Sequence, residues 1–262
     1  MSRLSTHCPV VKSLTSKSST ASAKFLDRLP MTERYAIYFA PAVNEPLWRL
    51  ACEWLGRDPA GDGIRHRPPG IDAPQLDSLT ISARRYGFHA TIKAPMRLAE
   101  GTNRAELEAA IQAFALSHEV FEVGVPVLRL IDGFLALVLE PQPHRLTDFA
   151  GTCVTLFDRF RAPMSEEDRA ARVGKGLSER QVTLLDQYGY PYVLEQFLFH
   201  MTLSDRLPTT WRGPLKDLAT DWFAPVLIKP LVIDRLALFH QPEAGAPFAR
   251  VADFPLTTAH EI

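Results

Sequence analysis

The chain has 262 residues, of which 46% are hydrophobic and 23% are charged, and its formal net charge is −1. A chain of this length and apolar content can bury a substantial core, which excludes disorder of the whole and fits one large domain or two modest lobes. The near-neutral charge argues against general nucleic-acid binding, because such binding neutralises many phosphates with Lys and Arg.

The first thirty residues are rich in Ser, Thr and Lys, a composition that gives little reason to fold. We therefore expect a disordered extension over residues 1–30. An over-extended translation start, with Met31 as the true first residue, is the alternative. The extension holds much of the positive charge, so the remaining chain is mildly acidic.

No apolar run approaches the roughly 20 residues needed to span a bilayer, and the N-terminus lacks the apolar core of a secretory signal. The cysteines, Cys8, Cys52 and Cys153, lie far apart without a Cys-x-x-Cys pair. Neither a zinc site nor a disulfide framework is indicated. These features predict a cytoplasmic protein with no membrane partner.

The first predicted elements are a strand over 34–40 and a helix that begins near Asn44, with Pro46 in its first turn. Gly, Pro and Asp then mark a long loop over 56–73, which is either a mobile cover near a site or a surface excursion. A second strand is predicted over 86–94.

Asn103 and Glu106 have the spacing of a helix start, and an apolar stripe continues to Ala115. Strands are predicted over 120–130 and 134–139, on either side of an Asp-Gly turn signal.

Apolar spacing predicts a further helix over 146–160, and the charged segment 159–176 is expected to cross between lobes. Ser178 and Gln181 form a capping-box pattern before another helix, which should end near Tyr188.

A strand is predicted over 197–203, followed by a helix with an apolar stripe over 215–223 and by closing strands over 231–239 and 248–254. Strands interspersed with amphipathic helices and hairpins predict an α+β fold rather than a doubly wound parallel sheet.

Two of the predicted strands repeat one pattern: residues 88–92 read F-H-A-T-I and residues 199–203 read F-H-M-T-L. Alternate side chains of a strand share a face, so each copy presents one imidazole and one hydroxyl on the same side. A single H-x-T is a weak signal, since most histidines are surface or core residues. Two copies in matching apolar settings are harder to explain by packing alone.

The longer strings Y-G-F-H-A-T-I-K-A-P at 86–95 and F-H-M-T-L at 199–203 resemble the two-histidine (2H) phosphoesterase superfamily, in its branch associated with phosphonate-metabolism operons (DUF1045-like). R-Y-A-I-Y-F-A-P at 34–41 and G-Y-P-Y-V at 189–193 extend the resemblance, which covers residues 31 to about 256. The resemblance implies one bilobal domain over 31–262. Its fold would be two pseudo-symmetric lobes, each a mostly antiparallel sheet backed by helices, with the active cleft between them.

Phosphodiester hydrolysis needs a base, an acid and donors for the phosphoryl oxygens, and histidine fills both proton roles near pH 7. We predict that His89 and His200 are the acid/base pair, without assigning which is which. Thr91 and Thr202, each two residues further on, fit as donors to the phosphoryl oxygens.

Three further side chains, Lys93, Arg206 and Tyr86, complete the candidate substrate-binding set. Lys93 shares the strand face of His89 by spacing, and it is either a phosphate-binding cation or a solvated edge lysine. The corresponding positions in the second copy are Ser204 and, one step further, Arg206. Tyr86 is included, although it would face away from His89 unless Gly87 introduces a bulge.

Tyr35 and Tyr38 point to opposite faces of the first strand, so at most one should line the cleft, and a core role is favoured for both. No H-x-H, H-E-x-x-H or carboxylate cluster accompanies either motif, so neither a metal nor another cofactor is expected.

The leading function is therefore metal-independent hydrolysis of a small cyclic or linear phosphodiester, and the resemblance suggests a ribose 1,2-cyclic phosphate. An RNA-end enzyme acting on 2′,3′-cyclic phosphates is one alternative. A non-catalytic phosphate-ligand binding protein is the other. The expected partner is a small phosphorylated substrate, and the sequence leaves the oligomeric state undecided.

Overall fold

A computed structural model describes residues 33–61, 63 and 66–258. By its contacts the chain divides into two units, Met1–Met31 and Thr32–Ile262, and every described residue belongs to the second. The expectations for residues 1–30, for Met31 and for Cys8 lie outside the described residues.

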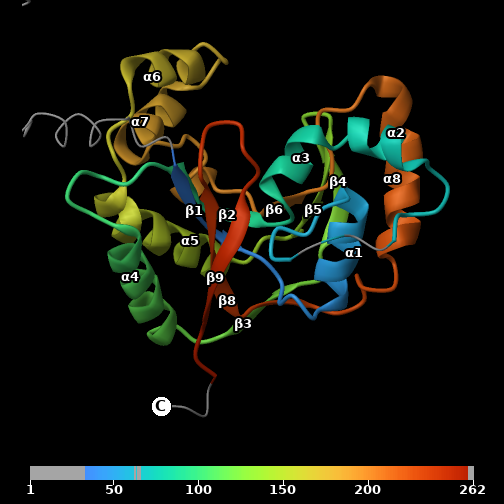
Figure 1. Ribbon diagram of the computed structural model, residues 1–262, viewed down its shortest axis with the longest axis horizontal. Helices are drawn as coiled ribbons and strands as arrows, with labels where there is room; N and C mark the ends of the chain where they lie inside the picture. The colour runs from blue at the N-terminus through green and yellow to red at the C-terminus, as the bar shows by residue number, and fades with distance from the viewer. Residues whose placement is uncertain (1–32, 62, 64–65, 259–262) are drawn as a thin grey trace, which may run out of the picture. The chain divides into compact units, whose positions relative to one another are not determined.

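The described chain contains nine strands and eight α-helices (Figure 1). The strands are β1 (Arg34–Phe39), β2 (Ala90–Met96), β3 (Phe121–Gly124), β4 (Val127–Ile131), β5 (Phe134–Val138), β6 (His200–Thr202), β7 (Leu231–Ile233), β8 (Arg235–Gln241) and β9 (Ala249–Pro255). The helices are α1 (Pro46–Leu55), α2 (Ala73–Ser78), α3 (Ile81–Tyr86), α4 (Arg104–Leu116), α5 (His144–Phe157), α6 (Glu166–Val173), α7 (Glu179–Tyr188) and α8 (Thr209–Phe223). Two 3-10 helices, η2 (Asp158–Phe160) and η3 (Leu194–Gln196), are also present.

Seven strands form one sheet in the order β4-β5-β6-β2-β1-β8-β9, and each neighbouring pair is antiparallel. The strands β3 and β7 form a separate antiparallel pair. The α+β prediction with mostly antiparallel sheets is confirmed. The large sheet has two halves, because β2 and β6 are joined only through the pair Ala90–Met201.

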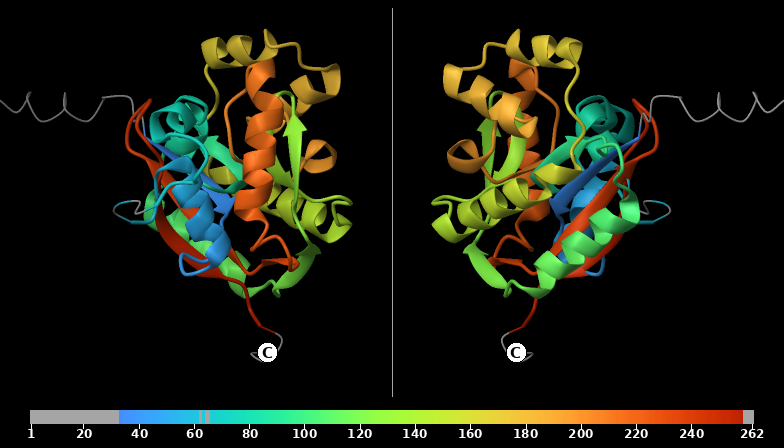
Figure 2. Two further views of the ribbon diagram at one scale, coloured as in Figure 1. Left: turned by 90° about the vertical axis from the view of Figure 1, so that its right-hand side faces the viewer. Right: turned by 90° about the vertical axis from the view of Figure 1, so that its left-hand side faces the viewer.

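The two halves repeat one order of elements. Strand β2 is followed by α4, which packs on β8 and β9, and strand β6 is followed by α8, which packs on β4 and β5. Figure 2 shows α8 on one side of the described unit and α4 on the opposite side. The two predicted lobes are thus the two halves of one sheet, each backed by its own helix.

Local sequence signals account for several helix ends. Asn103 accepts from the backbone of Glu106, whose side chain accepts in return, so the predicted helix start is confirmed and takes the form of a capping box. Ser178 and Gln181 form the same reciprocal pair at α7. Each box satisfies amide groups that the first turn of a helix leaves unpaired.

The predicted strand 120–130 was wrong in its continuity, because it is two strands, β3 and β4, interrupted before Pro126. Proline has no N–H to donate to a sheet. The predicted strand 231–239 is likewise divided into β7 and β8, with Asp234 between them. At both breaks the chain passes from the small sheet into the large one, and hydropathy alone does not mark that change of partner.

Three short helices, α2, α3 and α6, were not predicted, because none is long enough to show a repeated apolar stripe. One of them also corrects the strand predicted from Tyr86. Tyr86 ends α3, Gly87 turns the chain with φ of 80°, and β2 begins only at Ala90.

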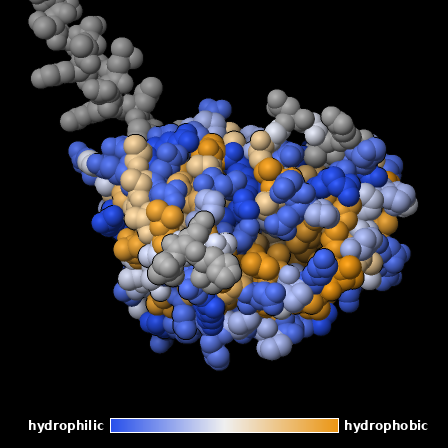
Figure 3. Space-filling view, turned by 90° about the horizontal axis from the view of Figure 1, so that it is seen from below, coloured by the Kyte–Doolittle hydropathy of each residue, from blue (hydrophilic) through white to orange (hydrophobic). Residues whose placement is uncertain are grey.

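The face seen from below carries apolar side chains on its surface (Figure 3). The chain between α8 and β7 contributes Ile228, which is 70% exposed, beside a hollow of about 470 Å³ that Pro46 and Pro126 also line. Within the described part of the chain, no helix has both the length and the apolar character needed to cross a membrane.

Candidate functional site

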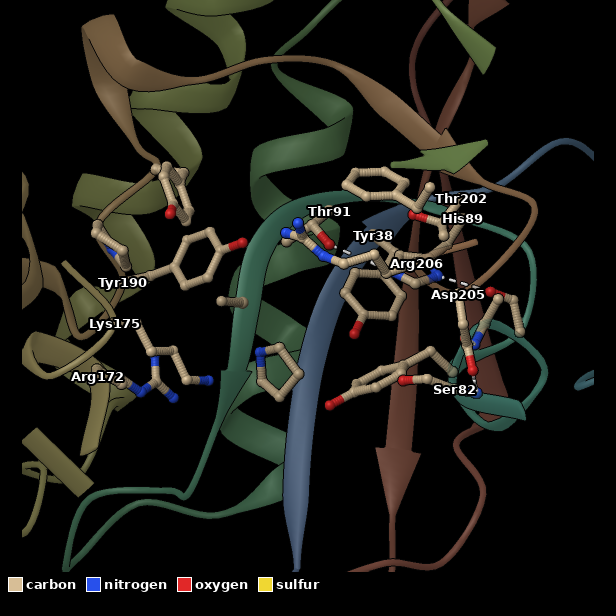
Figure 4. Close-up of a pocket in the computed structure, with 18 of the residues that line it drawn as sticks. Tyr38, Ser82, His89, Thr91, Arg172, Lys175, Tyr190, Thr202, Asp205 and Arg206 are labelled. Atoms are coloured by element: carbon tan, nitrogen blue, oxygen red, sulfur yellow. Dashed lines mark hydrogen bonds between the residues drawn. The ribbon is translucent and has the colours of Figure 1, made fainter. Parts of the chain in front are cut away.

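A hollow of about 560 Å³ is lined by residues of both halves of the large sheet. Figure 4 shows His89, Thr202 and Arg206 on one side of it and Arg172 and Lys175 on the other. Its lining residues include Arg34, Tyr38, Tyr86, His89, Thr91, Pro95, Phe134, Arg172, Lys175, Tyr190, Thr202, Ser204, Asp205 and Arg206.

The register between β2 and β6 brings the two motifs together. Ala90 pairs with Met201, and both side chains are fully buried on the side of the sheet away from the hollow. In an antiparallel pair, one step from this point places His89 opposite Thr202, and Thr91 opposite His200. The two histidines are then diagonal neighbours, which typically lie roughly 7–8 Å apart, with their Cβ atoms somewhat closer.

Both imidazoles are held by the same type of hydrogen bond to a backbone carbonyl. Nδ1 of His89 donates to the carbonyl of Gly87 at 2.8 Å, and Nδ1 of His200 donates to the carbonyl of Leu198 at 2.8 Å. The acceptor lies two residues before the histidine in each copy. Because a carbonyl only accepts, this bond assigns the Nδ1–H tautomer and leaves Nε2 of each ring to exchange a proton.

Burial lowers the pKa of both histidines. For His89 the pKa falls from 6.5 to about 4, mainly by loss of solvation, with a further lowering by the charge of His200. Burial also lowers the pKa of His200, and the bond to Leu198 partly opposes this shift. The two rings are therefore close enough for the charge of one to disfavour protonation of the other.

The position of His200 differs from that of His89. His89, Thr91 and Thr202 line the hollow, whereas His200 is not part of its lining. The ring of His200 lies beside Phe134, with ring centroids 5.8 Å apart, and Phe134 does line the hollow. His200 thus lies at the border of the hollow, on the strand next to Thr91.

The prediction for Lys93 was wrong in its direction. Lys93 is 3% exposed, and its Nζ donates to the carbonyl of Val154 at 3.1 Å and to Oδ1 of Asp158 at 3.0 Å. The register of β1 with β2 slips by one residue between Ile37 and Tyr38. Such a bulge adds a residue to one strand and reverses the alternation of faces. Lys93 therefore points toward α5, and Pro95, further along β2, lines the hollow.

Tyr38 lines the hollow and Tyr35 does not, in agreement with the prediction that at most one tyrosine of β1 would do so. The Tyr38 ring stacks on the His89 ring at 3.7 Å between centroids and 17° between planes. Its hydroxyl is buried and has no hydrogen-bond partner among the described residues. Burial raises the pKa of Tyr38, so the group remains a donor that a ligand can engage.

The side chains of Tyr86, Ser204 and Arg206 also line the hollow. Tyr86 reaches it from the end of α3, so no bulge at Gly87 is involved; instead a Cβ at Gly87 would lie 2.7 Å from Pro59. The Ser204 hydroxyl is engaged internally, because it accepts from the amide of Leu135 and donates to the carbonyl of Asp205.

Asp205 was not predicted, and it links the two motif segments. Its carboxylate accepts from the amide of Ser82 at 2.9 Å and from the amide of Ala83 at 3.0 Å, at the start of α3. Its own amide donates to the carbonyl of Leu79. Asp205, which follows β6, therefore fixes the helix that leads into the His89 motif.

Sequence reasoning also missed Arg34, Arg172 and Lys175, because they lie far from both motifs in the chain. Together with Arg206 they give the hollow four cationic side chains, while Asp205 is the one acid among the described residues that line it. The one signal for Arg172 and Lys175 in the sequence is the length of the charged connection that precedes β6, since long connections often carry binding residues.

The arrangement suits an anionic ligand that exchanges protons. The His89 imidazole, two threonine hydroxyls and a surplus of positive charge line one hollow, and His200 lies at its border. The described residues contain no group of three or more His, Cys, Asp or Glu side chains arranged to hold a metal ion.

Comparison with known proteins gives one family and two curated relatives. A family model described as "Protein of unknown function (DUF1045)" matches residues 91–249. "Ribose 1,5-bisphosphate phosphokinase PhnN" of Janthinobacterium sp. (strain Marseille) is 38% identical over 230 residues, which cover 86% of this chain and 51% of that protein. A protein of the same name from Laribacter hongkongensis (strain HLHK9) is 34% identical over 215 residues, 82% of this chain and 50% of that protein.

The chain spans about half the length of these curated relatives. Among solved structures, "Crystal structure of phosphoesterase" aligns with a TM-score of 0.37 and 15% identity, over 86% of this chain and 99% of that chain.

Proposed function

The chain belongs to the family described as "Protein of unknown function (DUF1045)", and we propose that it is a metal-independent phosphodiesterase of the 2H type. The observation that carries this proposal is the pairing of Ala90 with Met201, which sets both His-x-Thr motifs on one face of the sheet. A phosphodiester bound there has an imidazole on each side and hydroxyl donors between them.

We propose that the phosphoryl oxygens are held by Thr91, Thr202 and Arg206, and that Tyr38 donates its free hydroxyl to the same ligand. These groups are arranged before the substrate arrives, so they stabilise developing negative charge with little reorganisation. Without substrate, Thr91 donates its hydroxyl proton to Nε2 of His89 at 3.2 Å. On binding, this single proton turns to the phosphoryl oxygen, which frees Nε2 to take a proton from water.

The two histidines divide the proton transfers. One neutral imidazole takes a proton from water as the water oxygen bonds to phosphorus. The other, protonated, gives its proton to the oxygen of the P–O bond that breaks, so charge and protons balance. We place the shared proton on His200, because burial, followed by the charge of His200, lowers the pKa of His89 to about 4. We assign His89 as the base and His200 as the acid.

The substrate we propose is a ribose 1,2-cyclic phosphate. Opening this ring at the bond between phosphorus and O2 leaves a phosphate on O1. The curated relatives bear the name of a kinase of ribose 1,5-bisphosphate, a sugar that carries one phosphate at O1. A phosphodiesterase that leaves a phosphate on O1 would form one of the two phosphate groups of that sugar.

A panel of phosphodiesters assayed in excess EDTA tests the proposal. Ribose 1,2-cyclic phosphate should be hydrolysed at the same rate before and after chelation. Faster turnover of 2′,3′-cyclic nucleotides would favour the RNA-end alternative. Loss of activity in EDTA, restored by one divalent ion, would overturn the metal-independent mechanism, and binding without turnover of any member would favour a ligand-binding protein.

A further inference from the structure

A second hollow, of about 330 Å³, adjoins the first and shares Arg34, Pro95 and Arg172 with it. Its other lining residues include Arg97, Arg161 and Asp168. Four arginines therefore surround a space in which Asp168 is the one acidic side chain among the described lining residues.

The two shared arginines are oriented by neutral oxygens. Nε of Arg34 donates to Oε1 of Gln241 at 2.7 Å, across the β1–β8 pair. Nη1 of Arg172 donates to the carbonyl of Gly189 at 3.0 Å. These bonds fix each guanidinium without neutralising it, so both charges remain available to an anion.

Arg161 and Arg97 differ in how strongly a carboxylate engages their charge. Arg161 forms a two-point ion pair with Asp158, so its charge is already neutralised within the protein. Arg97 lies 4.0 Å from Asp168, and both side chains are largely exposed, at 41% and 60%. Exposed pairs of this kind contribute little, so Arg97 is free to exchange Asp168 for a stronger anion.

We propose that this second hollow binds a phosphomonoester group carried by the same substrate whose diester lies between His89 and His200. The proposal rests on the proposed function, and it defines the substrate class as a sugar with two phosphoryl groups. Arg97 acts only on the second group, whereas Arg34 and Arg172 lie between the two.

The spacing of the two hollows suits one small molecule. Thr91 borders the first hollow only, and Pro95 borders both. Four strand residues span about 13 Å between Cα atoms, and the arginine side chains reach into this interval. One phosphate cannot occupy both ends, whereas a pentose with a phosphoryl group at each end can approach them together.

Substitution of a residue that lines only the second hollow tests this assignment. Arg97→Gln should lower kcat/KM about tenfold for ribose 1,2-cyclic phosphate that carries a 5-phosphate, through a higher KM. The same variant should leave kcat/KM unchanged for ribose 1,2-cyclic phosphate without the 5-phosphate. Arg159→Gln is the matched control, because Arg159 is exposed, stacks over Phe160 at 4.8 Å and lines neither hollow. Equal losses on both substrates, or no loss on either, would overturn the proposal.

A binding measurement separates this inference from the proposed function. By calorimetry, the wild-type protein should bind ribose 1,5-bisphosphate about tenfold more tightly than ribose 1-phosphate, and Arg97→Gln should remove the difference. This result would support the second subsite even if no phosphodiester were hydrolysed. Equal affinities for the two ligands in the wild-type protein would contradict it, whatever the catalytic result.

Discussion

The two copies of the His-x-Thr motif agree in their local bonds and differ in their surroundings. In each copy Nδ1 donates to a carbonyl two residues earlier. His89, however, stacks on Tyr38 and accepts from Thr91, whereas His200 lies beside Phe134 and has no hydrogen bond at Nε2 within the described chain. The repeated residues thus set the direction of each ring, and neighbours distant in sequence set its ease of protonation.

This difference suggests how a duplicated motif can perform two unlike steps. A base must stay neutral and an acid must hold a proton, so two identical environments would serve poorly. The stronger shift at His89 comes from burial and from the charge of the other ring. Substitutions in each copy can show whether the two histidines act together and where their roles diverge.

The largest effect is expected from the histidines themselves. His89→Ala and His200→Ala should each lower kcat by roughly 10²- to 10⁴-fold, since each removes a proton-transfer group. The double variant should lose less than the product of the two effects, because groups that act as a unit are non-additive. Steady-state kinetics on the best phosphodiester, with circular dichroism to check folding, give the measurement.

His118→Ala is the matched control for these variants. Nδ1 of His118 also donates to a carbonyl, that of Phe114 at 2.8 Å, and its ring stacks on Phe114 at 3.9 Å. It lies outside the lining of the hollow, so kcat should stay at the wild-type value. Wild-type turnover in a folded His89 or His200 variant would contradict the paired assignment.

Lys93 and Arg206 each follow one of the two motifs, and their substitution should change different properties. The Lys93 variant should lose stability, and the Arg206 variant should lose affinity for the substrate. Lys93→Met should lower the free energy of unfolding by roughly 2–3 kcal/mol, because it removes buried hydrogen bonds to a carbonyl and a carboxylate. Its KM should not change. Arg206→Gln should raise KM with little effect on unfolding, because Arg206 is exposed at the hollow. Urea unfolding and steady-state kinetics on both variants measure this difference. A raised KM in Lys93→Met would contradict the structural role of Lys93.

The sequence predicted most of what is local in this fold. The starts of α4 and α7, the apolar stripes and the two motifs were all readable from spacing. The reversal of Lys93 was not, because a bulge depends on how β1 pairs with β2. Nor was the recruitment of Arg34 and Arg172 to one hollow, since only the tertiary fold brings β1 and α6 together.

Tyr38→Phe should affect function more than stability, with kcat/KM lowered about tenfold. The lost hydroxyl has no partner within the described residues, so the free energy of unfolding should stay level or rise by about 1 kcal/mol. Thermal unfolding and kinetics test this pair of outcomes. Unchanged kinetics would show that the hydroxyl does not reach the substrate.

The pH dependence of kcat/KM tests the different protonation of the two rings. His89 must be neutral, which holds above its pKa of about 4, and His200 must be protonated, which holds below a pKa lowered from 6.5. The profile should therefore be bell-shaped with its maximum between about pH 4 and 6.5. A maximum above pH 7.5 would contradict these shifts.

In the proposed mechanism both imidazoles face one phosphoryl group. Long-range ¹H–¹⁵N spectra of histidine-labelled protein, titrated with inorganic vanadate as an analogue of the transition state, measure this directly. The Nε2 signals of His89 and His200 should shift together with one dissociation constant, while the His118 signals stay unchanged. A shift at one ring alone, or two different dissociation constants, would contradict the claim.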